Sequence, residues 1–426
     1  MASHPETLLV ANDSRAPVTP ERRPRVAYLM SRFPKLTETF ILYEILAMEQ
    51  LGVAVDVYPL LREPEPVMHP EAAAVVRRAR FQPFLSWPIL RANLGFALRK
   101  PRRYFGTLWD VLRGTMGSLN FFVGAIGIFP KSARAAALMA EEGVEHVHAH
   151  FATHPALAAF IIHRLAGIPY SFTAHGSDLH VERRMLREKV EEAAFVVTIS
   201  NYNRELIAQE CGGRHRDKVK VIHCGVDTGV FTPVARRAEG PVSLLCIGTL
   251  HEVKGQTYLI EACRLLRERK LDVVCRFVGD GEDRAMLQAQ IEQAGLGGRV
   301  ELLGRRTREQ IAALLADTDI VVTPSVPTKG GKREGIPVVL MEAMASGVAV
   351  VASGISGIPE LVEHERGGLL VPPRDAAALA AAIERLAGDA ELRERLGQAG
   401  REKVLREFDL ASNAAELAAA FKRGGR

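Results

Sequence analysis

Short apolar runs alternate with longer amphipathic stretches along most of the chain. In the first half, runs typical of buried strands occur at 25–30, 53–58, 144–147, 170–173, 195–199 and 219–222. Helical patterns lie between them at 37–52, 155–166 and 203–209. Strands that alternate with helices predict a parallel sheet covered on both faces.

The same alternation starts again after a Gly- and Pro-containing stretch at 232–241. Strands are expected at 242–247, 273–278, 300–303, 320–323 and 348–352, and helices at 256–269, 283–293, 308–316 and 337–345. Helix-rich sequence follows from Asp375 onward. We therefore predict an α/β fold with two doubly wound, Rossmann-like domains at 25–237 and 238–405, preceded by a disordered tail at 1–24.

Composition narrows the class of protein. With 47% hydrophobic and 25% charged residues, the chain is not intrinsically disordered, collagen-like or a small disulfide scaffold. Five cysteines without a C-x-x-C pair fit reduced thiols in a cytosol. The first 25 residues lack the apolar core of a signal peptide, and the apolar run at 119–129 is too short to span a bilayer. We expect a cytoplasmic protein, either soluble or attached to the inner face of the cell membrane.

Charge is distributed unevenly along the chain. The net charge is +5, but residues 77–134 carry eleven basic side chains and one acidic one, so the rest of the chain sums to −5. Both tryptophans and eight other aromatic residues are interleaved with these charges. Three interpretations remain open for this segment: a membrane-surface contact, a solvated basic face over an ordinary core, and a nucleic-acid surface. No nucleic-acid-binding motif accompanies the segment, so we expect no nucleic-acid partner.

The most informative motif is Glu334-Gly-Ile-Pro-Val-Val-Leu-Met-Glu342, in which two carboxylates are separated by seven residues. Pro337 suits the first turn of a helix, which places Glu334 in the preceding loop and Glu342 inside the helix. The free N–H groups at a helix N-terminus attract anions. An anion bound there would have Glu342 nearby to accept hydrogen bonds from a diol such as ribose. Two surface glutamates flanking a capped helix are the simpler alternative for this spacing alone.

Two further segments follow predicted strands. Gly248-Thr-Leu-His-Glu-Val-Lys254-Gly255 opens a predicted helix, and a lysine in such a turn can neutralise a phosphate. Phe172-Thr-Ala-His175-Gly-Ser-Asp178 ends a strand, where open α/β sheets bind their ligands. A solvated lysine and a histidine satisfied by local backbone groups are the simpler alternatives.

Three alternate histidines, His146, His148 and His150, invite a metal hypothesis because alternate residues of a strand share one face. No matching set of carboxylates is evident, and a buried parallel strand is not expected to project three polar rings to one side. We therefore predict no metal site. His150, at the carboxyl end of the strand, is expected to line a cleft.

Together these segments resemble the retaining glycosyltransferases of family 4, which have the GT-B fold, and in particular the bacterial exopolysaccharide and colanic-acid branch. Further segments that carry the resemblance are Ser31–Ile41, His148–Phe151, Val221–Asp227 and Gly357–Leu361. The resemblance covers roughly residues 25–422. It implies transfer of a sugar from a nucleotide diphosphate sugar, without a metal, to a saccharide or polyprenyl-linked acceptor. It also implies that a final helix within 406–426 crosses back to the first domain.

The resemblance also assigns roles to residues. Glu334 contacts the donor sugar, Glu342 the ribose, Lys254 the diphosphate, and His175 lies near the donor sugar. The donor-binding set is completed by Gly248, Thr249, Lys332, Arg333, Gly335, Ile336 and Pro337.

The chain departs from the family pattern in two places. Many members have an arginine five residues before the lysine, where this chain has Thr249, and Lys332 and Arg333 are the expected substitutes. The first loop, Ser31-Arg-Phe-Pro, replaces a Gly-Gly turn. Acceptor contacts are therefore expected from Arg32, Lys35 and Glu38, with His150 as a fourth candidate.

Other functions are compatible with parts of the pattern. A non-hydrolysing sugar-nucleotide epimerase has the same architecture and needs no acceptor sugar. A nucleotide-binding scaffold with a dead site is favoured slightly by Thr249. A dehydrogenase is not expected, since no G-x-G-x-x-G follows a predicted strand.

Overall fold

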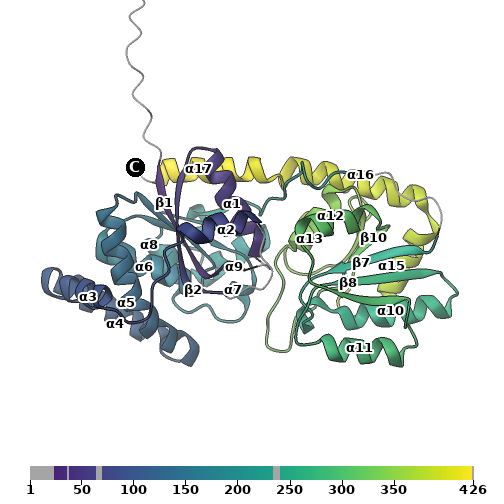
Figure 1. Cartoon of the computed structure of the whole chain (residues 1–426), viewed down its shortest axis with the longest axis horizontal. Helices are drawn as coiled ribbons and strands as arrows, with labels where there is room; N and C mark the ends of the chain where they lie inside the picture. The colour runs from purple at the N-terminus through teal and green to yellow at the C-terminus, as the bar shows by residue number, and fades with distance from the viewer. Residues whose placement is uncertain (1–23, 36–37, 64–69, 234–239, 425–426) are drawn as a thin grey trace, which may run out of the picture.

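The computed structural model describes residues 24–35, 38–63, 70–233 and 240–424. The chain folds into two α/β halves that lie side by side, with the last two helices running along one edge of both (Figure 1). The predicted boundary at 237/238 and nearly all of the predicted tail, 1–23, lie outside the described residues. Two parallel sheets of six strands each confirm the predicted fold class.

The N-terminal half contains a parallel sheet of order β2-β1-β3-β4-β5-β6. Its strands are β1 (Arg25–Phe33), β2 (Ala54–Arg62), β3 (His146–His150), β4 (Tyr170–Ala174), β5 (Phe195–Thr198) and β6 (Val219–Val221). Its helices are α1 (Thr39–Gln50), α2 (Pro70–Arg78), α3 (Trp87–Arg99), α4 (Pro101–Thr115), α5 (Leu119–Glu141), α6 (His154–Ala166), α7 (Ser177–His180), α8 (Leu186–Glu192) and α9 (Asn201–Glu210).

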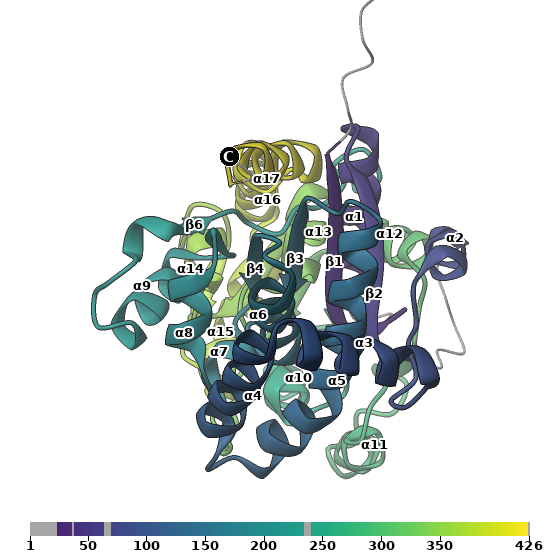
Figure 2. The same cartoon turned by 90° about the vertical axis from the view of Figure 1, so that its left-hand side faces the viewer.

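Alternation along β1 explains why helices cover both faces of this sheet. Ala27 and Leu29 point into a core shared with α5 and α6, whereas Tyr28 and its alternate neighbours point into a core shared with α1 and the last helix, α17 (Leu410–Gly424). In Figure 2, α6 lies in front of the sheet and α17 lies at the top of the view. In α17, Phe421 lies against the rings of Tyr28 and His148, so the end of the chain completes the N-terminal core.

The C-terminal half contains a second parallel sheet, of order β12-β11-β10-β7-β8-β9. Its strands are β7 (Val242–Ile247), β8 (Val273–Val278), β9 (Val300–Gly304), β10 (Ile320–Thr323), β11 (Ala349–Ser353) and β12 (Leu369–Val371). Its helices are α10 (Gln256–Glu268), α11 (Arg284–Gln293), α12 (Arg308–Ala316), α13 (Val338–Ala345), α14 (Ile358–Leu361), α15 (Ala376–Gly388) and α16 (Ala390–Glu407). The sheet separates a core shared with α10, α11 and α15 from one shared with α12 and α13.

The helices α3, α4 and α5 form a group that projects from the N-terminal half, away from the C-terminal half (Figure 1). Within the described ranges, α5 is the one helix long and apolar enough to cross a membrane, and half of its most apolar window is buried inside the protein. We predicted that the apolar run at 119–129 is too short to span a bilayer. That prediction was wrong for the helix as a whole, because α5 continues beyond the run, through Pro130 to Glu141.

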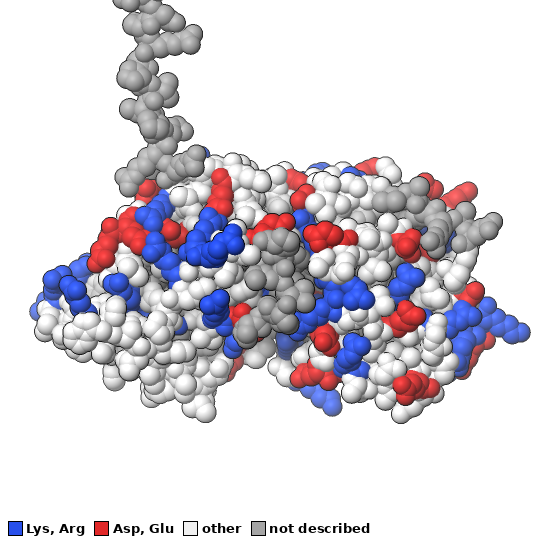
Figure 3. Space-filling model, viewed as in Figure 1, with Lys and Arg blue, Asp and Glu red and all other residues white. Residues whose placement is uncertain are grey.

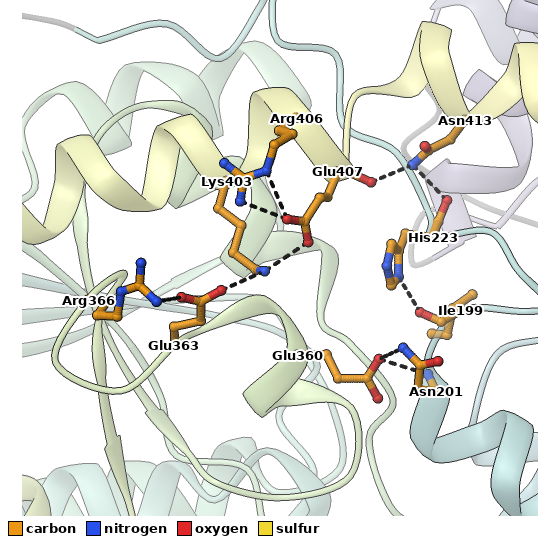
Figure 4. A network of polar contacts seen from close by, with 10 residues as sticks. All are labelled: Ile199, Asn201, His223, Glu360, Glu363, Arg366, Lys403, Arg406, Glu407 and Asn413. Carbon is orange, nitrogen blue, oxygen red and sulfur yellow. Dashed lines mark hydrogen bonds and ion pairs between the residues drawn. The ribbon is translucent and has the colours of Figure 1, made fainter.

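Polar contacts join the two halves near the point where the chain passes from α16 to α17 (Figure 4). The carboxylate of Glu360, on α14, accepts hydrogen bonds from the backbone N–H groups of Asn201 and Tyr202, each at 2.7 Å. These are the first residues of α9, so a carboxylate from one half satisfies the free N–H groups of a helix in the other. Asn413, on α17, donates to the carbonyl oxygen of His223 at 3.1 Å.

Candidate functional site

A cavity of about 390 Å³ lies between the two halves, and both contribute to its lining. Parallel α/β sheets place their binding loops beyond the carboxyl ends of their strands, and these loops form most of the wall here. From the N-terminal half, the lining includes Glu38, Phe40, Tyr43, Phe151, His175 and Cys224. From the C-terminal half, it includes Gly248, Thr249, Lys254, Arg305, Arg306, Arg308, Lys332, Arg333, Glu334, Gly335, Ile336, Pro337 and Glu342.

Lys254 and Glu334 form an ion pair on the C-terminal wall of the cavity. Lys254 follows β7 and ends a short 3-10 turn, Glu252–Lys254, before Gly255 starts α10. The hydroxyl group of Ser325 donates to the other oxygen of the Glu334 carboxylate. Both members of the pair are largely shielded, with side chains 18% and 13% exposed. Lys254 and Glu334, which belong to different sequence motifs, therefore contact one another directly.

Glu342 lies in the fifth position of α13, next to the cavity. Burial raises the pKa of its carboxyl group to about 7, and the nearby positive charge of Arg308 opposes this rise. Pro337 immediately precedes the helix, so its missing N–H group leaves no helical hydrogen bond unmade. The motif thus places one carboxylate before the helix and a second one inside it, as the spacing predicted.

The two halves touch at Gly335. A β-carbon at this position would collide with the carbonyl oxygen of His175, which belongs to the other half. A β-carbon on Gly176, where φ is +122°, would in turn lie 2.9 Å from the Cα atom of Gly335. Glycine is therefore required at both positions for the cavity to close in this way.

His175 follows β4 and forms part of the cavity wall. Its ring lies between Phe40 and Phe151, with ring centroids 4.7 and 4.8 Å away. Burial, together with the neighbouring His150, holds the pKa of His175 well below its usual value. The ring facing the cavity is therefore neutral at physiological pH.

Of the four residues expected to contact the acceptor, one lines the cavity and three do not. Glu38 lines the cavity, but Arg32 and Lys35 lie outside its wall, Arg32 in an ion pair with Glu63 at 2.9 Å and Lys35 in one with Glu38. The expectation that His150 lines a cleft was wrong, because its side chain is fully buried behind His175.

Three arginines that the sequence analysis missed line the cavity: Arg305, Arg306 and Arg308. The guanidinium group of Arg308 lies 4.1 Å from the ring centroid of Tyr43 across the cavity, and 3.2 Å from the Asp227 carboxylate. The available signal was a cluster of three arginines in four residues directly after a predicted strand. Thr249 also lines the cavity, and Lys332 and Arg333, its expected substitutes, lie in the same wall.

The three alternate histidines do project to one side of β3, contrary to our argument against such a placement. All three rings are buried. Both ring nitrogens of His148 contact hydroxyl groups on β4, those of Ser171 at 2.8 Å and Thr173 at 2.9 Å, which explains how the sheet tolerates this ring. A carboxylate is also present, since Glu44 lies close to His148 and His150 in a grouping that could hold a metal ion. Because the nitrogens of His148 already have partners, the absence of a metal stays our prediction.

Two sheets facing across a cleft, with paired carboxylates and several cations on one wall, define a two-domain α/β protein whose cleft is suited to binding an anion. The family models identify it further. Residues 37–230 match the model described as Glycosyltransferase Family 4, and residues 231–403 match that of Glycosyl transferases group 1. The chain belongs to these glycosyltransferases, and the comparisons do not favour an epimerase or a dead scaffold.

Individual relatives agree with this assignment. The chain is 32% identical to the colanic acid biosynthesis glycosyltransferase named WcaL of Escherichia coli K12, over 90% of this chain and 96% of that one. It is 36% identical to the amylovoran biosynthesis glycosyltransferase AmsK of Erwinia amylovora, over 55% of this chain and 59% of the other. The crystal structure of Anabaena HepE in complex with UDP has the same fold, with a TM-score of 0.68 at 19% identity over 94% of this chain and 100% of that one.

Proposed function

We propose that the protein transfers a sugar from a nucleotide diphosphate sugar to a saccharide or polyprenyl-linked saccharide, with retention of the anomeric configuration, in bacterial exopolysaccharide biosynthesis. The observation that carries the proposal is the Lys254–Glu334 ion pair on the cavity wall, next to the start of α13 and close to Glu342. The exopolysaccharide assignment rests on the printed names of two relatives, for colanic acid and amylovoran.

The basic residues of the cavity wall suit a diphosphate. Lys254, Arg305, Arg306, Lys332 and Arg333 all line it, so cations approach the cavity from three loops of the C-terminal half. When a diphosphate binds Lys254, it competes with Glu334 for the ammonium group. The carboxylate of Glu334 is then free to accept hydrogen bonds from hydroxyl groups of the donor sugar, and that of Glu342 from the ribose diol.

The same cations support transfer without a bound metal. Negative charge develops on the diphosphate as the glycosidic bond breaks, and cations that are already in place lower the barrier to this step. We propose front-face attack. The bond between the anomeric carbon and the phosphate oxygen breaks with its electron pair on the phosphate, the acceptor oxygen bonds to the same face of that carbon, and the acceptor proton passes to the leaving phosphate.

A thermal-shift panel of nucleotide diphosphate sugars tests the donor half of the proposal, because a ligand that binds only the native state raises the melting temperature. One donor class is expected to stabilise the wild type, and Lys254→Met is expected to lose most of that shift. Glu334→Gln should retain binding but lose turnover by orders of magnitude. NMR of the product should show the donor's anomeric configuration retained. A wild type that no donor stabilises, or an inverted product, would contradict the proposal.

A second part of the proposal places the enzyme on the cytoplasmic face of the membrane, where a polyprenyl-linked acceptor would lie. Its support is the apolar face of the group α3–α5. Of the seventeen large hydrophobic side chains exposed among the described residues, twelve lie between 84 and 126: Phe84, Leu85, Trp87, Leu90, Leu94, Leu98, Phe105, Trp109, Met116, Leu119, Val123 and Ile126. Apolar patches of this kind on a soluble surface mark sites of interaction.

Charge around the apolar face favours an anionic bilayer as the partner. Six basic residues, Arg91, Arg99, Lys100, Arg102, Arg103 and Arg113, lie in the same span, against one acid, Asp110. In the space-filling view, the region over α4 and α5 shows few charges and is bordered by blue side chains toward α3 (Figure 3). Each basic residue near an anionic leaflet contributes about 1 kcal/mol, so five of them would support reversible attachment. Not every aromatic residue of the segment belongs to this face, since Phe121 and Phe129 are buried.

Vesicle co-sedimentation tests this attachment. The wild type is expected to sediment with vesicles that contain phosphatidylglycerol, to dissociate with added salt, and to bind pure phosphatidylcholine more weakly. Replacing the exposed Trp87 and Trp109 with serine should weaken binding at least tenfold. The matched control is Leu405→Ser, an exposed apolar residue on α16. Equal binding of both variants, or salt-insensitive binding, would contradict a membrane face.

A further inference from the structure

A chain of polar contacts runs from the cavity wall into the interior of the N-terminal half. The Sγ atom of Cys224 lies 3.7 Å from Nδ1 of His175. Nε2 of His175 lies 3.1 Å from Nδ1 of His150. Nε2 of His150 lies 3.3 Å from the carboxylate of Glu44, which is on α1. Residues from α1, β3 and the segments that follow β4 and β6 thus connect the cavity to one carboxylate behind it.

Burial makes this chain sensitive to the placement of each proton. The His150 side chain is fully buried, and its Nε2 atom has no hydrogen-bond partner of good geometry among the described residues. The Glu44 carboxylate is the acidic group that this nitrogen faces. The same carboxylate oxygen accepts a hydrogen bond from the hydroxyl group of Tyr28 at 2.8 Å. Glu44 is therefore an acceptor at the inner end of the chain.

The direction of every link follows from this acceptor. A neutral imidazole has one donor nitrogen and one acceptor nitrogen. If Nε2 of His150 carries the proton that faces Glu44, then its Nδ1 atom is an acceptor. Nε2 of His175 must then donate to it, which leaves Nδ1 of His175 as an acceptor. Cys224 fits this order, because burial raises the pKa of its thiol and keeps the S–H donor in place.

We propose that Glu44 and His150 are positioning residues that hold His175 in the tautomer protonated at Nε2. In this tautomer, Nδ1 of His175 accepts a hydrogen bond from a hydroxyl group of the sugar bound in the cavity. A thiol is a weak donor, so a sugar hydroxyl group displaces Cys224 from Nδ1 at little cost. The part played by the sugar rests on the proposed function, whereas the tautomer itself does not.

The tautomer can be read in the full-length protein without substrate, from two-bond proton–nitrogen correlation spectra of ¹⁵N-labelled histidine. The wild type is expected to show His175 protonated at Nε2. In Glu44→Leu, Nε2 of His150 loses the acceptor that it faces, so the order of the links is no longer fixed and His175 is expected as a mixture of tautomers. We expect this mixture together with a lower kcat/KM for the donor, because only part of the population can accept the hydrogen bond from the sugar.

Two variants serve as matched controls. Glu49→Leu removes a carboxylate on the same helix that pairs with Arg78, and it should leave both the tautomer and turnover unchanged. Tyr28→Phe removes the other hydrogen bond to Glu44 and should leave the His175 tautomer as in the wild type. Should Glu44→Leu fail to fold, His150→Phe fills a similar space and removes the acceptor of His175 Nε2, which should likewise give His175 as a mixture of tautomers.

The outcomes separate the two proposals. A wild-type His175 protonated at Nδ1, or a tautomer unchanged in Glu44→Leu, would overturn the positioning role whatever the enzyme transfers. A mixture of tautomers with normal donor kinetics would overturn the hydrogen bond from the sugar but leave the glycosyltransferase function intact. If no nucleotide sugar binds the wild type, the proposed function fails while the tautomer result still stands.

Discussion

Replacing Glu342 with glutamine is expected to stabilise the substrate-free protein above neutral pH while weakening donor binding. Burial raises the pKa of this carboxyl group from 4.5 to about 7. The folded state therefore holds a proton that the unfolded state has released between these two values. The contribution of this carboxyl group to the free energy of unfolding is therefore complete below pH 4.5. It falls as pH rises from 4.5 through 7, and it is lost above pH 7. A rise of about 2.5 units corresponds to about 3 kcal/mol at pH 8 and above.

Calorimetric unfolding of the wild type and of Glu342→Gln from pH 4.5 to 8.5 measures this effect. The variant should melt several degrees higher than the wild type at pH 8.5, and the difference should shrink toward pH 4.5. Glu301→Gln, at an exposed position on β9, is the matched control and should show no such trend. The donor should raise the melting temperature of the variant less than that of the wild type. A variant that melts lower at pH 8.5, or a difference independent of pH, would refute the reasoning.

Three other predictions concern the cleft and the last helix. Gly335→Ala places a methyl group against the carbonyl oxygen of His175. Turnover should therefore fall at least tenfold, with little change in melting temperature. Normal turnover would show that closure of the cleft does not require this contact. Replacing both Lys332 and Arg333 with alanine should weaken the binding of a nucleoside diphosphate about tenfold by titration calorimetry, and unchanged affinity would remove them from the clamp. Phe421→Ala removes a buried ring and should cost about 3–5 kcal/mol in urea unfolding, whereas a loss below 1 kcal/mol would contradict its role in the N-terminal core.

Most of the two sheets could be predicted because strands of a parallel sheet are buried on both faces and appear as short apolar runs. Every strand from β1 to β11 overlaps such a run, while β12, with three residues, is too short to stand out. The helices α3 and α4 were not predicted. Many of their large apolar side chains are exposed, so apolar positions in these two helices do not mark a buried face as they do elsewhere in the chain.

The C-terminal wall of the candidate site was easier to predict than the N-terminal one. Lys254, Glu334 and Glu342 lie in compact motifs directly after strands or at a helix start, where local sequence determines position. The Glu44–His150 contact joins α1 to β3 across about a hundred residues, and no local pattern encodes it. The histidine triplet was misjudged for a related reason, because its hydroxyl partners are on β4 and its apolar cover, Phe421, comes from the end of the chain.

The position of Phe421 has a consequence for synthesis of the protein. During translation, the N-terminal sheet emerges from the ribosome long before α17, which covers the face carrying Tyr28 and His148. That face therefore stays open to water, or to a chaperone, until α17 has been made. The N-terminal half therefore cannot reach its full stability before the C-terminal half and α17 have been made. Truncation within α17 should reduce the yield of folded enzyme, although the residues that line the cleft would still be encoded.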